Sequence, residues 1–345
     1  MGLFGRKKSS IGLDIGSGFV KLVQVDHSGD QPEVTRIATR PLLPDAIVEG
    51  EVMDPGLVAD TVRELFAEVG AKGDSVITAV GGHDVIIKKI EMDRMNVSDA
   101  REVIRWEAEQ HVPFDIRSVE LDFQILDSEA EGDQMQVLLV AAKRELVENK
   151  VSLLMDAGLQ PAAIDVDAFA LHNAFEHNYP EGMEGIVALV NVGHDTTNVN
   201  ILADGIPILT RDIPFGSRNI REDLQRERSL TAEEAEEVVQ GRGHVEVLSS
   251  FVETGAEEIA VGIERAAAFL MTQHSGAGLG RIYLAGGGSR VPGMLETLGK
   301  RMGVETSVVN PFERVPIRPG APINMVVDEA GPMLLLPLGL ALRSP

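Results

Sequence analysis

Cysteine is absent from the 345 residues of the chain. Without thiols the chain forms no disulfide framework, no thiolate zinc site and no cysteine nucleophile. A long hydrophobic run is also missing. The most apolar stretch, residues 333–342, is interrupted by Pro337 and is much shorter than the ~20 residues that a membrane span needs. We therefore expect a chain that does not cross a membrane.

Basic residues are few relative to acidic ones, because 31 Lys and Arg stand against 54 Asp and Glu, a formal net charge of -23. A surface this acidic repels phosphate backbones, so the composition argues against general nucleic-acid binding. The exception is the first ten residues, MGLFGRKKSS, with three basic residues at 6–8. This segment is either a frayed basic terminus or a weak contact to a membrane surface or a partner.

The pattern along the chain predicts an α/β architecture with one inserted subdomain. A glycine-rich strand–turn–strand over 11–26 precedes a helix at 54–69, and a second strand–turn–strand begins near 186. Between them, strands and a helix capped by Ser98 indicate a compact α+β block. The predicted divisions are 1–84 (domain I, first part), 85–160 (insert), 161–185 (domain I, second part), 186–331 (domain II) and 332–345 (C-terminal helix returning to domain I).

An internal repeat is the most informative feature of the sequence. The segment LDIGSGFVKLVQVDHSG begins at Leu13, and VNVGHDTTNVNILADG begins at Val190. Gly16 corresponds to Gly193, and Asp14 corresponds to Asn191. One glycine hairpin is weak evidence, since such hairpins are common. Two hairpins in corresponding halves indicate a duplicated structure.

The residues of these hairpins suit a polyphosphate held between two turns. Glycine lets the backbone approach a phosphate, so that successive N–H groups point at the anion. Asp14 can hold Mg²⁺ through water, and Lys21 can reach a phosphate. The expected phosphate-binding residues are Gly16, Ser17, Gly18 and Lys21 in the first hairpin, with Gly193, Thr196 and Thr197 in the second.

A third glycine turn, LAGGGSRVPG, spans 284–293. A strand that ends in three glycines before a helix offers a flat surface on which a purine and its ribose can lie. By itself this signal is weak, because GGGS also occurs in ordinary loops.

Taken together, the ordered motifs resemble the actin-like ATPase superfamily, and within it the PilM family of type IV pilus assembly proteins, relatives of FtsA. The matching stretches include GLDIGSGFVKLVQV, EAEQHVPFDIRSVELDFQIL, IDVDAFAL, TRDIPFGSRNI and PLGLALR. This resemblance implies an actin-like (ribonuclease H-like) fold, with two domains flanking a nucleotide cleft and an FtsA-like α+β insert. It also implies ATP and Mg²⁺ as ligands.

The resemblance assigns roles to particular residues. It implies an adenosine motif at Gly286, Gly287, Gly288, Ser289 and Arg290, and a helix opening on the nucleotide side at Gly216 and Asn219. Asp167 stands where relatives place a group that faces the attacking water, and it is equally interpretable as a helix cap. Asp14, Asp167 and Asn191 are thus the candidate catalytic residues, with Asp14 as the metal ligand.

Two departures from the family pattern bear on catalysis. The second phosphate motif usually starts with Asp, whereas Asn191 supplies no charge to Mg²⁺ and cannot act as a base. Val239 stands where such sequences usually carry Lys, and no lysine occurs between Lys150 and Lys300. We expect ATP binding with slow hydrolysis or none. His194, inside the second loop, is interpreted as a solvated side chain rather than a catalyst.

The resemblance also implies partners and a location. The groove beside the insert is expected to receive the cytoplasmic N-terminal peptide of a PilN-like inner-membrane protein. Other pilus platform proteins, assembly ATPases among them, are further expected partners, and a homo-oligomer is possible. The expected location is cytoplasmic, at the inner membrane's cytoplasmic face. The alternatives are a small-molecule kinase of the sugar- or acetate-kinase branch, and an FtsA-like filament protein, which would need a basic membrane helix after GLALRSP.

Overall fold

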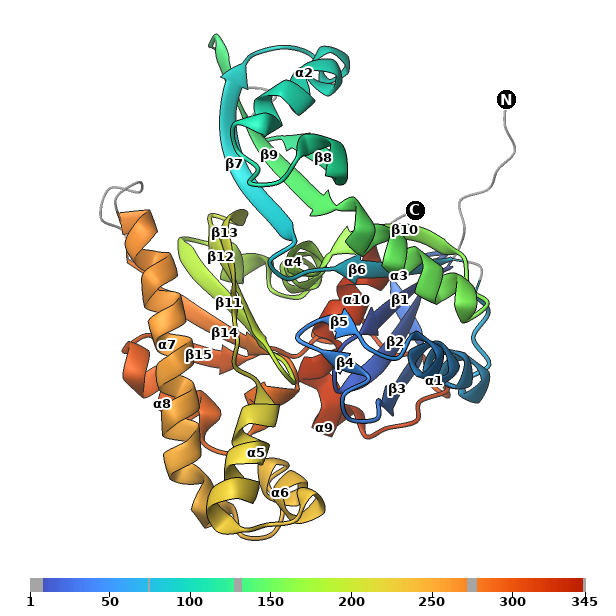
Figure 1. Cartoon of the computed structure of the whole chain (residues 1–345), viewed down its shortest axis with the longest axis vertical. Coiled ribbons are helices and arrows are strands. Elements are labelled where there is room, and N and C mark those ends of the chain that lie inside the picture. Colours follow the sequence, from blue (N-terminus) through green and yellow to red (C-terminus); the bar gives the residue numbers. More distant parts are fainter. Residues whose placement is uncertain (1–8, 74, 127–131, 272–277, 344–345) are drawn as a thin grey trace. The chain divides into compact units, whose positions relative to one another are not determined.

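The computed structural model describes residues 9–73, 75–126, 132–271 and 278–343 (Figure 1). The basic residues 6–8 lie outside this part of the chain. The chain divides into two compact units, one formed by Met1–Ala79 with Leu154–Pro345 and the other by Val80–Leu153. Each unit is described by itself below.

The first unit contains two five-stranded sheets built on the same plan. In one, the order is β10-β6-β1-β2-β3, with β1 (Ser9–Ile15), β2 (Phe19–Asp26), β3 (Glu33–Pro41), β6 (Val76–Val80) and β10 (Pro161–Val166). In the other, the order is β13-β12-β11-β14-β15, with β11 (Ile186–Val192), β12 (Thr197–Ala203), β13 (Ile206–Ile213), β14 (Arg281–Ala285) and β15 (Glu305–Val308). Each has an antiparallel meander beside a parallel strand, β6 or β14. The duplication predicted from the repeat is therefore confirmed.

The helices of this unit begin and end near the predicted positions. The helix expected at 54–69 is α1 (Pro55–Glu68), and the Asp54 side chain accepts a hydrogen bond from the Leu57 amide at its start. The long helix expected at 244–274 is α7 (Ser249–Met271), which follows a 3₁₀ turn at Val245–Leu248; residues 272–274 lie outside the described part. The others are α4 (Asp167–Asn178), α5 (Ser217–Arg228), α6 (Ala232–Val239), α8 (Met294–Met302), α9 (Val327–Ala330) and α10 (Leu335–Leu342).

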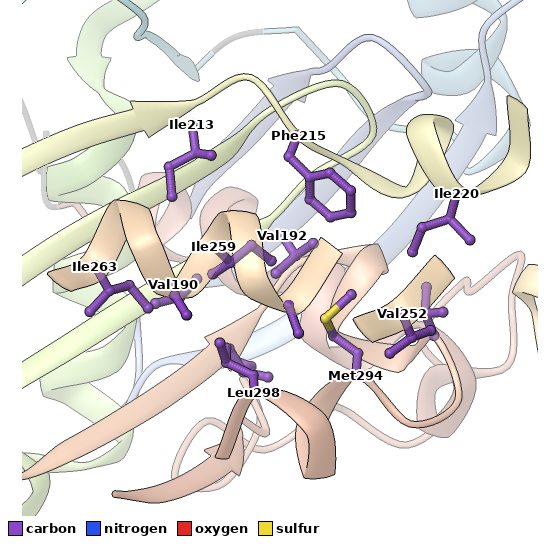
Figure 2. Close-up of a cluster of buried hydrophobic side chains, with 14 of the residues drawn as sticks. Val190, Val192, Ile213, Phe215, Ile220, Val252, Ile259, Ile263, Met294 and Leu298 are labelled. Atoms are coloured by element: carbon purple, nitrogen blue, oxygen red, sulfur yellow. The ribbon is translucent and has the colours of Figure 1, made fainter. Parts of the chain in front are cut away.

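The second sheet is stabilised by an apolar cluster on one of its faces (Figure 2). Val190 and Val192 of β11 point into it, and Ile259 and Ile263 of α7 pack against them. Met294 of α8 is fully buried in the same cluster. Burying such side chains contributes ~1.5–3 kcal/mol each. The cluster holds β11 and the loop that follows it in a fixed position relative to α7 and α8.

The C-terminal helix α10 packs more closely than side chains normally allow. A Cβ on Gly12 of β1 would lie 1.8 Å from the carbonyl oxygen of Pro337, and a Cβ on Gly339 would lie 1.7 Å from that of Ala170 in α4. Glycine at both positions therefore lets α10 pack directly on β1 and on α4. The surrounding cluster contains residues of both sheets together with α4 and α10. The apolar run at 333–342 is thus a core helix.

The second unit is a three-stranded sheet with helices. Its strand order is β7-β9-β8, with β7 (Val85–Asp93), β8 (Val119–Ile125) and β9 (Gln134–Lys143) all antiparallel. The helices are α2 (Val97–Glu109) and α3 (Arg144–Asp156), of which α3 continues into the first unit. The predicted cap at Ser98 is wrong, because the chain enters the helix earlier: Asn96 is the N-cap and accepts the Asp99 amide at 2.9 Å.

A test of the α10 packing is the substitution Gly339→Ala. Helix propensity alone would favour alanine by ~1 kcal/mol. The contact with the Ala170 carbonyl predicts the opposite sign, a loss of about 3 kcal/mol in the free energy of unfolding, because neither backbone can withdraw. Urea denaturation measures this change. Gly29→Ala is the control, since its Cβ would meet nothing closer than 3.5 Å. Unchanged stability of Gly339→Ala would contradict the packing described here.

Candidate functional site

The two repeated hairpins end in turns of the same geometry. In the first loop, between β1 and β2, the amide of Gly16 donates to the carbonyl of Phe19 at 3.1 Å. In the second loop, between β11 and β12, the amide of Gly193 donates to the carbonyl of Thr196 at 2.9 Å. Both turns close with a hydrogen bond over three residues, and both begin with glycine. The loops predicted to bind phosphate are therefore equivalent in structure as well as in sequence.

The residues just before and after each loop form a cross-strand pair. In the first hairpin, Lys21 Nζ donates to Asp14 Oδ2 at 2.5 Å. In the second, Asn191 Nδ2 donates to Asn198 Oδ1 at 3.1 Å. The structure thus pairs Lys21 with the predicted metal ligand, whereas the equivalent pair in the second hairpin is uncharged.

The two loops meet each other. A Cβ on Gly18 would lie 2.8 Å from Cγ of His194, so the imidazole packs directly against the first loop. The His194 side chain is 24% exposed, and burial lowers its pKa, so the ring is neutral at pH 7. The interpretation of His194 as a solvated loop side chain is therefore wrong. The amide of Leu42, just after β3, donates to the Gly18 carbonyl at 3.0 Å and ties this loop to its own sheet.

An ion pair between Arg218 and Asp45 joins α5, which contacts the second loop, to the segment after β3, which contacts the first loop. Arg218 of α5 donates from Nη2 to Asp45 Oδ1 at 2.9 Å and from Nε to Glu222 Oε1 at 2.5 Å. Asp45 lies in the segment after β3, which also contains Leu42, the residue whose amide is bonded to the Gly18 carbonyl of the first loop. Neither residue was singled out from the sequence, because nothing in the local pattern relates positions 45 and 218.

The third glycine turn packs against Val192, the last residue of β11, just before the second loop. A Cβ on Gly286, where φ is +81°, would lie 2.3 Å from the Val192 carbonyl oxygen, and a Cβ on Gly288 would lie 2.4 Å from Val192 Cγ1. Gly287 differs, because it is exposed and its Cβ would meet nothing within 4 Å. Two of the glycines thus allow close packing, and the middle one leaves an open backbone surface.

The start of α5 is also held by the second loop. The amides of Ser217 and Arg218 donate to the carbonyls of Gly193 and His194, at 3.0 and 2.9 Å. The Asn219 side chain accepts the Gly216 amide at 2.8 Å. Gly216 and Asn219 therefore fix the position of the loop, a role visible only in the fold.

Several other predicted site residues make structural contacts. The Thr197 hydroxyl donates to the Phe215 carbonyl at 2.8 Å, and the Ser289 hydroxyl donates to the Gly286 carbonyl at 2.7 Å. Arg290 donates to the Asp328 carbonyl. Asp167 is the first residue of α4, and the N-cap position belongs to Val166. Val239 is buried in the second sheet's apolar cluster.

The family comparison covers nearly the whole chain. The family model described as type IV pilus assembly protein PilM matches residues 12–345. The chain belongs to the PilM family. A solved PilM–PilN type IV pilus biogenesis complex is similar to this PilM-family chain with a TM-score of 0.85 and 30% identity, covering 99% of both chains. The predicted family is therefore confirmed.

More distant relatives share the fold of this PilM-family chain. Ethanolamine utilization protein EutJ from Carboxydothermus hydrogenoformans is 21% identical with a TM-score of 0.60, covering 97% of this chain and 90% of EutJ. MreB5 of Spiroplasma citri, solved with bound AMPPNP, is 12% identical with a TM-score of 0.54, covering 97% and 95%. The fold is the predicted two-domain actin-like fold.

A curated relative is the cell division protein FtsA of Bacillus subtilis (strain 168). It is 22% identical over 258 residues, which span 68% of this PilM-family chain but only 58% of FtsA.

One acidic residue of the site was missed from the sequence. Asp195 lies in the second loop with its side chain 10% exposed, and neither carboxylate oxygen has a hydrogen-bond partner within the described residues. The sequence signal that could have identified Asp195 is its negative charge inside a loop predicted to bind phosphate. A buried carboxylate without a hydrogen-bond donor is unfavourable, and the Arg218 guanidinium at 3.9 Å offers only charge attraction, so this site suits a hydrated metal ion.

Over residues 9–73, 75–126, 132–271 and 278–343, no group of three or more histidine and acidic side chains is placed to hold a metal. A metal here would therefore rely on one or two carboxylates, water and a bound ligand, as Mg²⁺ commonly does. In the same part of the chain, no helix is both long and apolar enough to cross a bilayer.

The open position of Gly287 makes a specific prediction about stability. Gly287→Asp is expected to fold with an unchanged melting temperature, because its side chain enters open space. Gly286→Asp is expected to lose about 3 kcal/mol or more, because it combines a positive φ with a clash against the Val192 carbonyl. Thermal denaturation followed by circular dichroism compares the two variants. Equal losses would contradict the difference between these neighbouring glycines.

Proposed function

We propose that this chain binds ATP with Mg²⁺ at the meeting point of its two hairpin loops and the Gly286–Gly288 turn. The observation that carries the proposal is the convergence of three segments far apart in sequence. Gly18 packs against His194, and the Gly286–Gly288 turn packs against Val192. The backbone of each loop turns tightly at a glycine, which suits it to present N–H groups to phosphate. The relative MreB5, solved with bound AMPPNP, has the same fold and supports the proposal.

Within this site the residues would take different roles. The amides of Ser17 and Gly18 would face the phosphates from one loop, and that of Thr196 from the other. The amides of Gly16 and Gly193 close the two turns and hold the loops in shape. The exposed backbone at Gly287 would support the purine. A bound triphosphate would contact or displace the His194 imidazole, which packs against Gly18.

Asp14 would hold Mg²⁺ through water while keeping Lys21 beside it. The metal would offset the negative charge of the phosphates. Asn191 donates its amide to Asn198 and contributes neither charge nor a base. We therefore propose slow turnover, or none, which suits an assembly scaffold better than a metabolic enzyme.

We further propose that the chain docks on the cytoplasmic N-terminal peptide of a PilN-like inner-membrane protein. The PilM–PilN complex, similar over 99% of both chains, supports this partner. In the second unit, β7 is at one edge of a three-stranded sheet and β8 is at the other. An extended peptide can add to such an edge through main-chain hydrogen bonds, and we propose β7 as that edge. Docking would hold the chain at the cytoplasmic face of the membrane.

A thermal-shift measurement tests nucleotide binding. A ligand that binds only the folded state at 100 times its dissociation constant adds about 2.7 kcal/mol, so millimolar ATP with Mg²⁺ should raise the melting temperature clearly. Gly287→Asp should abolish the shift, since a carboxylate would stand against the purine. Gly29→Asp, which places the same charge in the turn after β2, should keep it. No shift in the parent protein would refute ATP binding.

Hydrogen–deuterium exchange tests the peptide site. On adding a synthetic N-terminal peptide of the membrane partner, amide exchange should slow along Val85–Asp93 of β7, because the peptide pairs with its free edge. Exchange along Val119–Ile125 of β8, the matched edge, should not change. An affinity of about micromolar or weaker is expected, since the peptide loses conformational freedom on binding. Protection of β8 alone, or of neither strand at saturating peptide, would exclude β7.

A further inference from the structure

The carboxylate of Asp195, in the second loop, is buried but makes no hydrogen bond within the described residues. Both of its oxygens are buried without a hydrogen-bond partner among the described residues. The loop has no other acidic residue, since residues 191–197 read NVGHDTT. Asp195 is therefore a negative charge in a segment otherwise suited to bind an anion.

Two basic side chains lie near Asp195, but neither makes a hydrogen bond to it. His194 Nε2 and Arg218 Nη1 each lie 3.9 Å from Asp195 Oδ1, beyond hydrogen-bonding distance. Arg218 directs its hydrogen bonds to Glu222 and Asp45. Asp195 thus has a cationic neighbour in Arg218 but no hydrogen-bond donor, and it lies beside the imidazole that contacts Gly18 of the first loop.

The second hairpin has Asn191 at the position that corresponds to Asp14 of the first, and the Asn191 amide is already bonded to Asn198. One carboxylate is missing at the start of the loop, and one is present without a hydrogen-bond partner near its end. A hydrated divalent cation needs few protein ligands and accepts a carboxylate through water. A cation would also separate Asp195 from a phosphate that it would otherwise repel.

We infer that Asp195 is the second-loop ligand, direct or through water, of the divalent cation that accompanies the nucleotide, in place of the carboxylate missing at Asn191. The inference rests on the nucleotide binding proposed above. With the metal present, Asp195 attracts the metal–nucleotide complex. Without it, Asp195 repels the free nucleotide. Asn191 supplies no charge to a metal, and by itself it would predict that nucleotide binding depends little on the cation. With Asp195 as a ligand, nucleotide binding should depend strongly on the cation.

The first experiment measures metal affinity directly. Mn²⁺ is titrated into the full-length protein with saturating ADP, and the fraction bound is followed by electron paramagnetic resonance. Asp195→Asn should weaken Mn²⁺ binding about 10- to 100-fold, the scale on which losing a metal-supporting group acts. Asp30→Asn, the same charge change at an exposed site in the β2–β3 turn, should leave it unchanged. Adding Asn191→Asp to Asp195→Asn should restore much of the affinity.

The second experiment compares thermal shifts by ATP in EDTA and in Mg²⁺. The parent should respond only with Mg²⁺, whereas Asp195→Asn should respond in EDTA as well, because the repelling charge is gone. Without ligands, Asp195→Asn should be at least as stable as the parent, since the carboxylate has no hydrogen bond to lose and a neutral amide costs less to bury than a charge.

The outcomes separate the two proposals. If the parent binds nucleotide but Asp195→Asn leaves both the Mn²⁺ affinity and the Mg²⁺ dependence unchanged, the inference is overturned and nucleotide binding stands. A ligand-free Asp195→Asn that is much less stable than the parent, with no rescue of Mn²⁺ binding by Asn191→Asp, assigns Asp195 a purely structural role and also overturns it. If ATP with Mg²⁺ fails to shift the parent, the proposed nucleotide binding fails, and this inference with it.

Discussion

Close packing of α10 against β1 and α4 is the constraint on which the first unit depends. Gly12 and Gly339 let backbone meet backbone, where a side chain on either would overlap a carbonyl oxygen. The resulting apolar cluster includes residues of both sheets, so the two halves of the duplicated structure share one core. Each hairpin loop follows a strand anchored in a packed core. The loops can therefore meet in a defined geometry.

At that meeting point the electrostatics differ from what the residue types alone suggest. Lys21, the cation predicted to reach a phosphate, is paired with Asp14, and Arg290 of the predicted adenosine motif donates to the Asp328 carbonyl. Arg218, the basic residue beside the second loop, is bonded to Asp45 and Glu222. In the nucleotide binding proposed above, attraction for phosphate would then come from backbone N–H groups and from a bound cation. The net charge of -23 would favour the metal-bound form of the nucleotide over the free form.

Much of the fold was predictable, because its signals are local. The repeat of strand, glycine turn and strand predicted the duplicated sheets, and the apolar spacing predicted α1 and most of α7. Contacts between distant residues were not predictable in this way. Ser98 is a good capping residue by type, yet Asn96 is the cap, because the chain enters the helix two residues earlier. By residue type and position His194 is typical of a solvated loop residue, but in the fold its imidazole packs against Gly18 of the first loop.

The sequence by itself determined the family, the two glycine hairpins and the loss of a carboxylate at Asn191, since each depends only on the type and order of residues. Only the tertiary structure decided how those pieces act on one another. It brought Gly18 to His194 and Arg218 to Asp45, and it left the middle glycine of the 286–288 turn open. It also left the Asp195 carboxylate buried without a hydrogen-bond partner among the described residues. The physical reason is that burial and hydrogen-bond satisfaction depend on which distant segments become neighbours, which local periodicity does not encode.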